Sequence, residues 1–174
     1  DLARQLWMGT FHSLFARILR REAEVVGFPS DFVIYDTIDS RNLVKQIVRD
    51  LKLDDKIYKP SEVFNRISFA KNNLITPEAY MASNEIRVKD MATRRTEMGR
   101  VYDIYMKRCK KFGAMDFDDL LLQMNLLFRD HPVVLRKYQQ AFDYILVDEY
   151  QDTNYSQYLI LKELSSSHQN ICVV

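Results

Sequence analysis

Residues 144–154 read Tyr-Ile-Leu-Val-Asp-Glu-Tyr-Gln-Asp-Thr-Asn, and they indicate how the C-terminal part of the chain folds. It begins with a continuous apolar run, which is the pattern expected of a parallel strand covered on both faces. A helical pattern follows from about Asn154 to Leu164, and residues 171–174 predict the next strand. The chain is therefore predicted to finish in a strand–helix–strand unit of an α/β sheet.

Two acidic residues, Asp148 and Glu149, directly follow the apolar run. Ligand sites in open α/β sheets lie at the carboxyl ends of strands. In a nucleotide hydrolase, the first acid at such a place holds Mg²⁺, usually through a water, and the second takes a proton from the attacking water. An acidic pair after a strand also commonly begins a turn, so the pair by itself leaves both interpretations open.

Upstream of this unit the chain is predicted to be almost entirely helical. Apolar residues recur at helical spacing from Phe11 to Leu19, with Thr10 as the N-cap and with Gly27 and Pro29 as the stop. Residues 32–35 are predicted to be a short extended segment. Further helical patterns cover residues 40–51, 61–73, 84–112, 117–128 and 133–140.

Two residues indicate where these helical patterns are interrupted or begin. Gly99 lies inside the longest pattern and predicts a bend or break there, since glycine costs about 1 kcal/mol relative to alanine in a helix. Asp116 is predicted to be the N-cap of the next helix, with Asp119 favourable in its first turn.

Composition gives no overall argument for nucleic-acid binding. The 174 residues contain 25 Lys plus Arg against 24 Asp plus Glu, a net charge of +1. A DNA-binding surface must therefore come from local clusters, such as the basic residues between Arg94 and Lys111. Acidic neighbours, among them Asp90, Glu97 and Asp103, dilute this cluster, and a solvated helix face is the alternative.

Several classes of protein do not fit the sequence. No apolar stretch has the length of a membrane span and no signal-peptide pattern is present, so a cytoplasmic setting is expected. Cys109 and Cys172 lack the spacing of a zinc site or disulfide framework and are expected to be packing residues. Because the chain starts with Asp1 and stops within an apolar run, we expect a segment of a longer polypeptide.

The run from Ile145 to Asn154, followed by Gln157-Tyr158, resembles motif II of the UvrD/PcrA/Rep-type superfamily 1 DNA helicases, a Walker B strand with the pattern DExQDxN. Residues 9–14, Gly-Thr-Phe-His-Ser-Leu, resemble the motif Ib segment that contacts single-stranded DNA in that family. Residues 116–121 resemble a segment that precedes motif II in that family. Residues 70–73 resemble the family's sequences only loosely.

The resemblance implies a mostly α fold. A helical, DNA-contacting insert domain, residues 13–139, would be joined to a partial RecA-like α/β domain of the P-loop NTPase class, residues 1–12 and 140–174. It implies an ATP-dependent DNA helicase that moves 3′ to 5′ on single-stranded DNA and unwinds duplex DNA in processes such as DNA repair. The cofactors would be ATP and Mg²⁺, and the parent protein would be a monomer or weak dimer.

The same resemblance assigns roles to individual residues. Asp148 would hold Mg²⁺, Glu149 would be the general base, and Gln151 would sense the nucleotide and couple it to DNA movement. Five residues would contact DNA: Thr10, Phe11, His12, Lys71 and Asn72.

The phosphate-binding half of an ATPase site is missing from the sequence. Its glycines are Gly9, Gly27, Gly99 and Gly113, and no GxxxxGK[ST] pattern occurs. Without that loop the chain has no backbone cradle or lysine for the β and γ phosphates. We expect the chain alone to bind ATP poorly or not at all and to be inactive.

Two other functions stay open at this point. One is a helical adaptor or protein-interaction module in which Asp148-Glu149 is only a turn. The other is a metal-dependent nuclease that uses Asp116, Asp118, Asp148 and Glu149, whose carboxylates would have to converge on metals about 4 Å apart.

Overall fold

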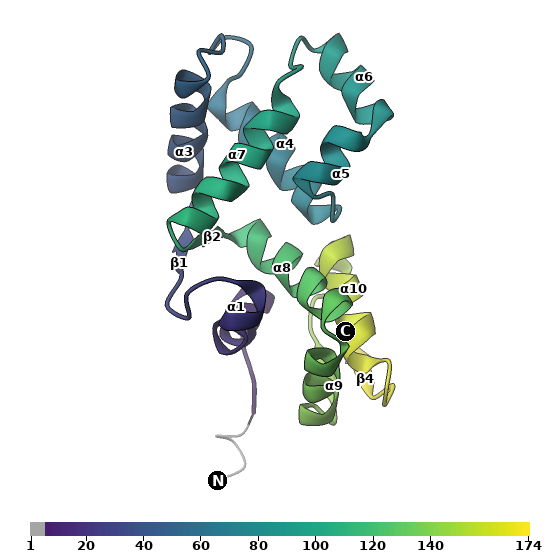
Figure 1. Ribbon diagram of the computed structural model, residues 1–174. Helices are drawn as coiled ribbons and strands as arrows, with labels where there is room; N and C mark the ends of the chain where they lie inside the picture. The colour runs from purple at the N-terminus through teal and green to yellow at the C-terminus, as the bar shows by residue number, and fades with distance from the viewer. Residues whose placement is uncertain (1–5) are drawn as a thin grey trace. The chain divides into compact units, whose positions relative to one another are not determined.

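The computed structural model describes residues 6–174. Its residues divide into two compact units: unit 1 contains the described residues up to Ser30 together with Leu120–Val174, and unit 2 contains Asp31–Asp119. Helices predominate in both, and each contains one two-stranded parallel sheet (Figure 1). The predicted domain borders lie instead after residues 12 and 139. The predicted borders separate a RecA-like domain from its helical insert. The division into two compact units is a different property and does not test that assignment.

Unit 2 combines five helices with a short sheet. The strands β1 (Val33–Tyr35) and β2 (Ala114–Asp116) pair in parallel, with Val33 opposite Ala114 and Tyr35 opposite Asp116. The helices are α3 (Thr37–Asp50), α4 (Pro60–Asn72), α5 (Pro77–Ala82), α6 (Asn84–Ala92) and α7 (Met98–Lys111). The extended segment at residues 32–35 is thus confirmed, whereas β2 and α5 were not predicted.

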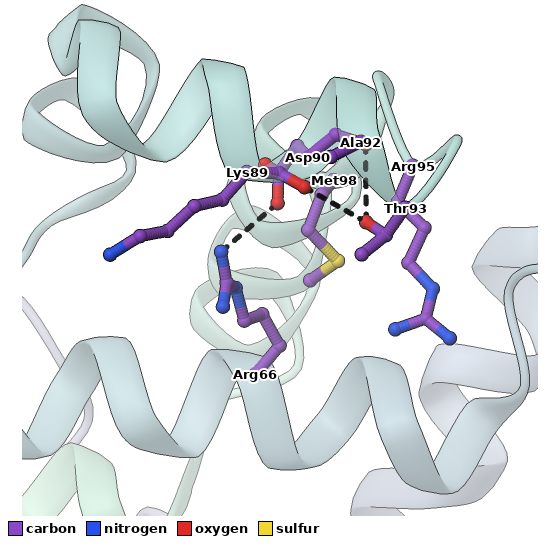
Figure 2. A pocket seen from close by; sticks show the side chains of 7 residues that line it. All are labelled: Arg66, Lys89, Asp90, Ala92, Thr93, Arg95 and Met98. Carbon is purple, nitrogen blue, oxygen red and sulfur yellow. Dashed lines mark hydrogen bonds and ion pairs between the residues drawn. The ribbon is translucent and has the colours of Figure 1, made fainter.

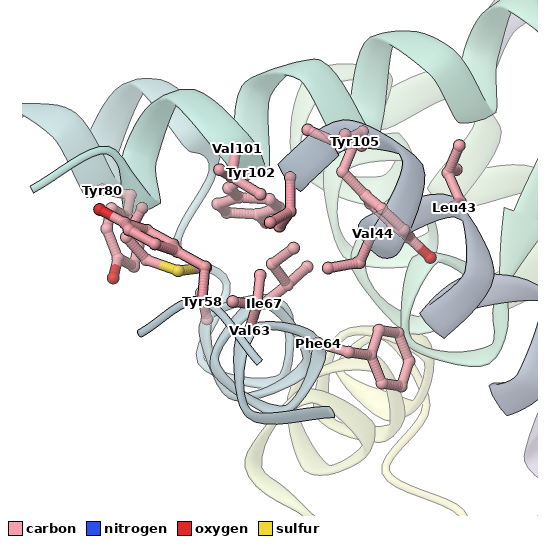
Figure 3. Close-up of a cluster of buried hydrophobic side chains, with 14 of the residues drawn as sticks. Leu43, Val44, Tyr58, Val63, Phe64, Ile67, Tyr80, Val101, Tyr102 and Tyr105 are labelled. Atoms are coloured by element: carbon pink, nitrogen blue, oxygen red, sulfur yellow. The ribbon is translucent and has the colours of Figure 1, made fainter. Parts of the chain in front are cut away.

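The core of unit 2 lies between α3, α4, α5 and α7, which pack against one another (Figure 3). Each helix contributes residues at helical spacing, such as Val44 and Ile47 from α3 or Val101 and Tyr105 from α7. Tyr58, Phe64 and Tyr80 are also buried in this cluster. These aromatic rings are therefore core residues.

The predicted helix over residues 84–112 is divided, but not at Gly99. The helix α6 ends at Ala92, Arg94 has a left-handed φ of +58°, and α7 begins at Met98. Gly99 lies buried inside α7, where a Cβ atom would come 2.6 Å from Met81 Cγ of α5. Glycine at this position avoids a collision with the Met81 side chain of α5, and the helix does not bend there.

Unit 1 holds the predicted strand–helix–strand unit. It contains α1 (Phe11–Arg21), α2 (Ala23–Val26), most of α8 (Phe117–Asp130), α9 (Pro132–Ala141), β3 (Ile145–Val147), the short 3₁₀ helix η2 (Tyr150–Asp152), α10 (Tyr155–Ser165) and β4 (Ile171–Val173). The strands β3 and β4 pair in parallel across α10. The Thr10 N-cap is confirmed, and Gly27, with a φ of +70°, ends α2 rather than one long helix.

The expectation that β3 is covered on both faces is wrong for the described residues. Val147 is buried, but the side chains of Tyr144 and Leu146 are 76% and 80% exposed. Alternate residues of a strand point to opposite faces, and the single crossover helix α10 can cover only one of them.

None of the helices in residues 6–174 has the length and apolar character needed to cross a membrane.

Candidate functional site

The acidic pair Asp148-Glu149 lies at the carboxyl end of β3, immediately after Val147. The main chain beyond β4 continues alongside it, because Val174 N donates to Val147 O at 3.0 Å and Tyr150 N donates to Val174 O at 2.9 Å. Both carboxylates are exposed. The parallel unit therefore presents them at the sheet edge where α/β proteins bind ligands.

Glu149 has an unusual backbone conformation for a residue with a side chain. Its φ of +53° and ψ of +41° lie in the left-handed region. Residues other than glycine rarely adopt this conformation, and those that do often lie at functional sites. Glu149 N donates to Asp148 Oδ1 at 2.9 Å, and Gln151 Nε2 donates to Glu149 Oε2. The three residues predicted to act on the nucleotide are thus linked to one another.

Other residues of the same motif hold the loop in place. Asn154 and Gln157 form a capping box at the start of α10, with both hydrogen bonds at 2.9 Å. Thr153 Oγ1 donates to Tyr150 O at 2.8 Å. The motif therefore contains residues that cap the helix or hold the loop, and three exposed residues, Asp148, Glu149 and Gln151.

The donor atoms of this pair suit magnesium. Mg²⁺ in nucleotide sites is held by one or two carboxylates, by waters and by phosphate oxygens, and an exposed pair of carboxylates supplies the protein part of that set. In residues 6–174 no group of three or more His, Cys, Asp or Glu side chains could hold a metal ion by itself.

The predicted DNA contacts near the N-terminus lie at the beginning of α1. Thr10 is exposed, and its Oγ1 accepts a hydrogen bond from Ser13 N at 3.3 Å. Phe11 and His12 are half-buried, and the Phe11 ring packs against Phe15 with centroids 5.6 Å apart. The structure brings the three residues together on one helical turn, and their contact with DNA stays a prediction.

Lys71 does not lie where a DNA-contacting lysine would. Its side chain is fully buried, with Nζ 2.7 Å from both Asp116 Oδ2 and Asp119 Oδ1. The ammonium group is inaccessible to DNA in this structure, so we correct the prediction and assign Lys71 a structural role. Asn72 is half-buried and donates to Ser68 O at 2.9 Å and to Asp118 Oδ1 at 2.7 Å.

The Lys71 cluster is a buried network that ties α4, α7 and the start of α8 together. Tyr105 OH donates to Asp116 Oδ2 at 2.7 Å, and Asp116 and Asp119 cap α8 reciprocally through Asp119 N to Asp116 Oδ1 at 2.8 Å and Asp116 N to Asp119 Oδ2 at 3.0 Å. The predicted N-cap role of Asp116 is confirmed. The sequence held a signal for the buried lysine, because Lys71 falls at helical spacing after Val63 and Ile67 on the buried face of α4.

Burial and charge separate the pKa values of the two carboxylates. Burial and the neighbouring Asp116 charge raise the pKa of Asp119 to about 7. Burial also acts to raise the pKa of Asp116, but Lys71 and the Tyr105 hydroxyl outweigh it and hold that pKa below its ordinary value. The pKa of Lys71 is raised because its two carboxylates outweigh the effect of burial.

This cluster argues against the nuclease alternative. Both oxygens of Asp116 already accept hydrogen bonds from Lys71, Tyr105 and Asp119, and its side chain is only 2% exposed. A carboxylate buried in this way cannot also reach a catalytic metal at the protein surface. Asp148 and Glu149 remain the exposed acidic pair.

The basic cluster between Arg94 and Lys111 is largely paired within unit 2. Ion pairs join Arg95 to Glu62, Arg100 to Glu97, Lys107 to Asp103 and Arg108 to Asp50. Acidic neighbours therefore do offset much of the positive charge of this cluster, as predicted. This surface gives little support to DNA binding.

A cavity of about 360 Å³ in unit 2 lies beside α6 (Figure 2). Two hydrogen bonds join residues of its lining: Arg66 Nη2 donates to Asp90 Oδ1 at 3.1 Å, and Thr93 Oγ1 donates to Asp90 O at 3.1 Å. Met98 forms an apolar part of its wall. We assign no ligand to it.

Comparisons with known proteins agree with the motif. The ATP-dependent DNA helicase PcrA of Leuconostoc citreum is 41% identical over 174 residues, covering 100% of this chain and 22% of that relative. The proteins of the same name from Staphylococcus aureus and Staphylococcus epidermidis are each 39% identical, with 100% and 99% of this chain and 23% of each relative covered. The chain thus spans less than a quarter of the length of these relatives. The profile of the UvrD/REP helicase N-terminal domain matches residues 1–174, and the chain therefore belongs to that helicase family.

Proposed function

We propose that this chain is the segment of an ATP-dependent DNA helicase that supplies the acidic half of the ATPase site and part of the DNA-contacting surface. The observation that carries the proposal is the exposed Asp148-Glu149 pair at the carboxyl end of β3, with Glu149 held in a left-handed conformation. Membership of the helicase family and the names of the relatives support the same function.

Each residue of the pair has a distinct task in the proposed mechanism. Bound Mg²⁺ neutralises the charge that develops on the ATP phosphates during hydrolysis. Asp148 would hold this ion, directly or through a water, and Glu149 would accept the proton of the attacking water. Gln151, whose amide donates to Glu149 Oε2, would position that carboxylate and release it when the nucleotide changes.

The remaining parts of the proposal follow the family resemblance. Residues 1–12 and 140–174 would belong to a RecA-like domain and residues 13–139 to a helical insert that contacts duplex and single-stranded DNA. Translocation would run 3′ to 5′ in a cytoplasmic protein that is a monomer or weak dimer. Thr10, Phe11, His12 and Asn72 would contact the strand.

The metal role is tested by Asp148→Asn in the full-length protein. A neutral amide is a poorer Mg²⁺ ligand than a carboxylate, so we expect the Mg²⁺ concentration that gives half-maximal DNA-stimulated ATP hydrolysis to rise at least severalfold. Asp143→Asn, at an exposed acid just before β3, is the matched control. Equal Mg²⁺ dependence in both variants would favour the adaptor function, in which the acids only form a turn.

The isolated chain supplies a second test. Because it lacks the GxxxxGK[ST] loop, we expect no Mg²⁺-dependent ATP hydrolysis even with single-stranded DNA present. A turnover well above that of a Glu149→Ala variant of the same chain would contradict this expectation.

A further inference from the structure

Two arginines of α1 stack on the chain's one tryptophan. The Cζ atoms of Arg17 and Arg21 lie 4.0 Å and 4.7 Å from the centroid of the Trp7 ring system. The arginines are four residues apart and therefore lie on the same face of the helix. Both are exposed, whereas Trp7 is half-buried.

The indole ring also contacts the aromatic residues of α9 and its C-cap. Trp7 meets Phe142 edge-on with centroids 5.2 Å apart and Tyr138 edge-on at 6.5 Å. Tyr138 and Phe142 are themselves stacked at 6.2 Å. The tryptophan is therefore a rigid base on which the two guanidinium groups rest.

Stacking leaves the hydrogen-bonding capacity of both arginines unused. A guanidinium group stacks through its plane, so its N–H donors still point outward from the edge. In the described part of the chain, no carboxylate lies within ion-pair distance of Arg17 or Arg21, and neither guanidinium donates a hydrogen bond. The neighbouring acid Glu22 is buried, and its Oε1 accepts from Lys137 at 2.5 Å and from Tyr138 OH at 2.7 Å.

The two guanidinium groups lie close enough to repel each other, and an anion would relieve that repulsion. Two like charges at positions i and i+4 of a helix repel each other. Glu22 attracts Arg21 electrostatically, but its Oε1 already accepts hydrogen bonds from Lys137 and Tyr138. A planar, pre-positioned guanidinium matches a phosphate group with two parallel hydrogen bonds. Immobilising each arginine on Trp7 lowers the entropy that it would lose on binding.

We propose that Trp7, Arg17 and Arg21 form a binding site for the phosphodiester backbone of single-stranded DNA. The inference deepens the proposed function, on which it rests for the identity of the strand. Arg17 lies seven residues along α1 from Thr10, which is about 10 Å at the rise of an α-helix. The site would extend the predicted contact at Thr10–His12 along the same helix.

Trp7 provides a direct probe, because no other residue contributes tryptophan fluorescence. The experiment titrates the full 174-residue chain with a fluorescein-labelled oligo(dT) strand and records anisotropy, and it repeats the titration with an unlabelled strand to record tryptophan emission. Both signals should change with the same midpoint. The titrations are repeated over a range of salt concentrations and with inorganic phosphate as competitor.

The Arg17→Ala/Arg21→Ala variant should bind the strand roughly tenfold more weakly, since it loses two charge-assisted contacts. Its slope of log affinity against log salt should be shallower by about 1.4, or about 0.7 for each lost phosphate contact. The Arg17→Lys/Arg21→Lys variant keeps the charges but not the paired donors, and should keep most of the slope while losing affinity.

The matched control is Arg136→Ala/Lys162→Ala, which removes the same charge from exposed positions of α9 and α10 in unit 1. It should bind the strand within about twofold of the unmodified chain, allowing only for the change in overall charge. Circular dichroism and thermal melting of every variant confirm that it is folded.

Three outcomes would overturn the inference: no strand binding by the unmodified chain at low salt, equal weakening in the control, or a Trp7 signal that does not change while anisotropy does. Displacement of the strand by millimolar inorganic phosphate would show a site for free phosphate instead of the backbone. None of these outcomes affects the tests of Asp148, which measure ATP hydrolysis by the full-length protein.

Discussion

Lys71 places a positive charge inside unit 2, 2.7 Å from the carboxylate oxygens of both Asp116 and Asp119. Removing charged groups from water is costly, and the mutual attraction compensates for that cost only while all partners are present. The network is therefore a fragile point of the fold, because the loss of the lysine would leave two buried carboxylates side by side.

We expect Lys71→Met to lower the free energy of unfolding by about 3 to 5 kcal/mol, because methionine fills the space but leaves the carboxylates unpaired. Urea denaturation followed by circular dichroism measures the change. Lys107→Met removes an exposed lysine paired with Asp103 at 2.7 Å and should cost less than about 1 kcal/mol. Similar losses in the two variants would show that the buried network contributes no more to stability than the exposed ion pair.

The same network predicts a pH dependence of stability. The pKa of Asp119 is raised from its ordinary 3.8 to about 7 in the folded chain, so the folded state binds this proton more tightly than the unfolded state. That contribution to stability is fully present below about pH 4 and is lost as the pH rises through about 7. The lowered pKa of Asp116 acts in the opposite direction, and its contribution is lost only in acid.

We therefore expect the unmodified chain to lose stability between pH 5 and pH 8 relative to Asp119→Asn, which has no proton to release at this position. Urea midpoints of both chains at several pH values in this window measure the difference. Parallel curves for the two chains would mean that Asp119 does not titrate there.

Among the elements, α5 and α7 show how packing can favour glycine over alanine inside a helix. A Cβ atom on Gly99 would lie 2.6 Å from Met81 Cγ and 3.5 Å from Tyr80 Cδ1. Alanine has a higher helix propensity than glycine by about 1 kcal/mol, but here it would have to displace the Met81 side chain. The two effects oppose each other at one position.

A double-mutant cycle separates them. We expect Gly99→Ala to be less favourable in the natural sequence than in a Met81→Ala background by at least about 1 kcal/mol, since the shortened side chain removes the collision. In that background the substitution should stabilise the helix. Additive effects on the unfolding free energy would mean that Met81 moves aside without cost.

The elements that the sequence predicted correctly are those with local signals. The N-caps Thr10 and Asp116 each follow from hydrogen bonds within one turn. The strand β2 was not predicted because it has three residues, all of them buried and without alternation. Its partner β1 lies about eighty residues earlier, and no local pattern reports such a pairing.

The candidate site was predictable in position but not in conformation. The apolar run before Asp148 places the acidic pair at the end of a parallel strand, as the structure has it. The left-handed backbone of Glu149 carries no sequence signal, because only tertiary context holds a residue with a side chain in that region. For the same reason, the partners of Lys71 and the stacking of Arg17 on Trp7 could not be read from spacing alone.

For the whole molecule, the central claim is that Asp148 and Glu149 form the hydrolytic half of an ATPase site. The most direct measurement compares ATP binding with DNA-stimulated ATP hydrolysis for Glu149→Gln in the full-length protein, with Glu163→Gln on the exposed face of α10 as the control. Glutamine keeps the size of glutamate but cannot accept the water's proton. Loss of a general base costs about 10²- to 10⁴-fold in rate, or roughly 3 to 5 kcal/mol of barrier. We predict such a loss with nearly unchanged ATP binding; hydrolysis within about threefold of the unmodified protein, far less than the loss expected for a general base, would contradict the claim.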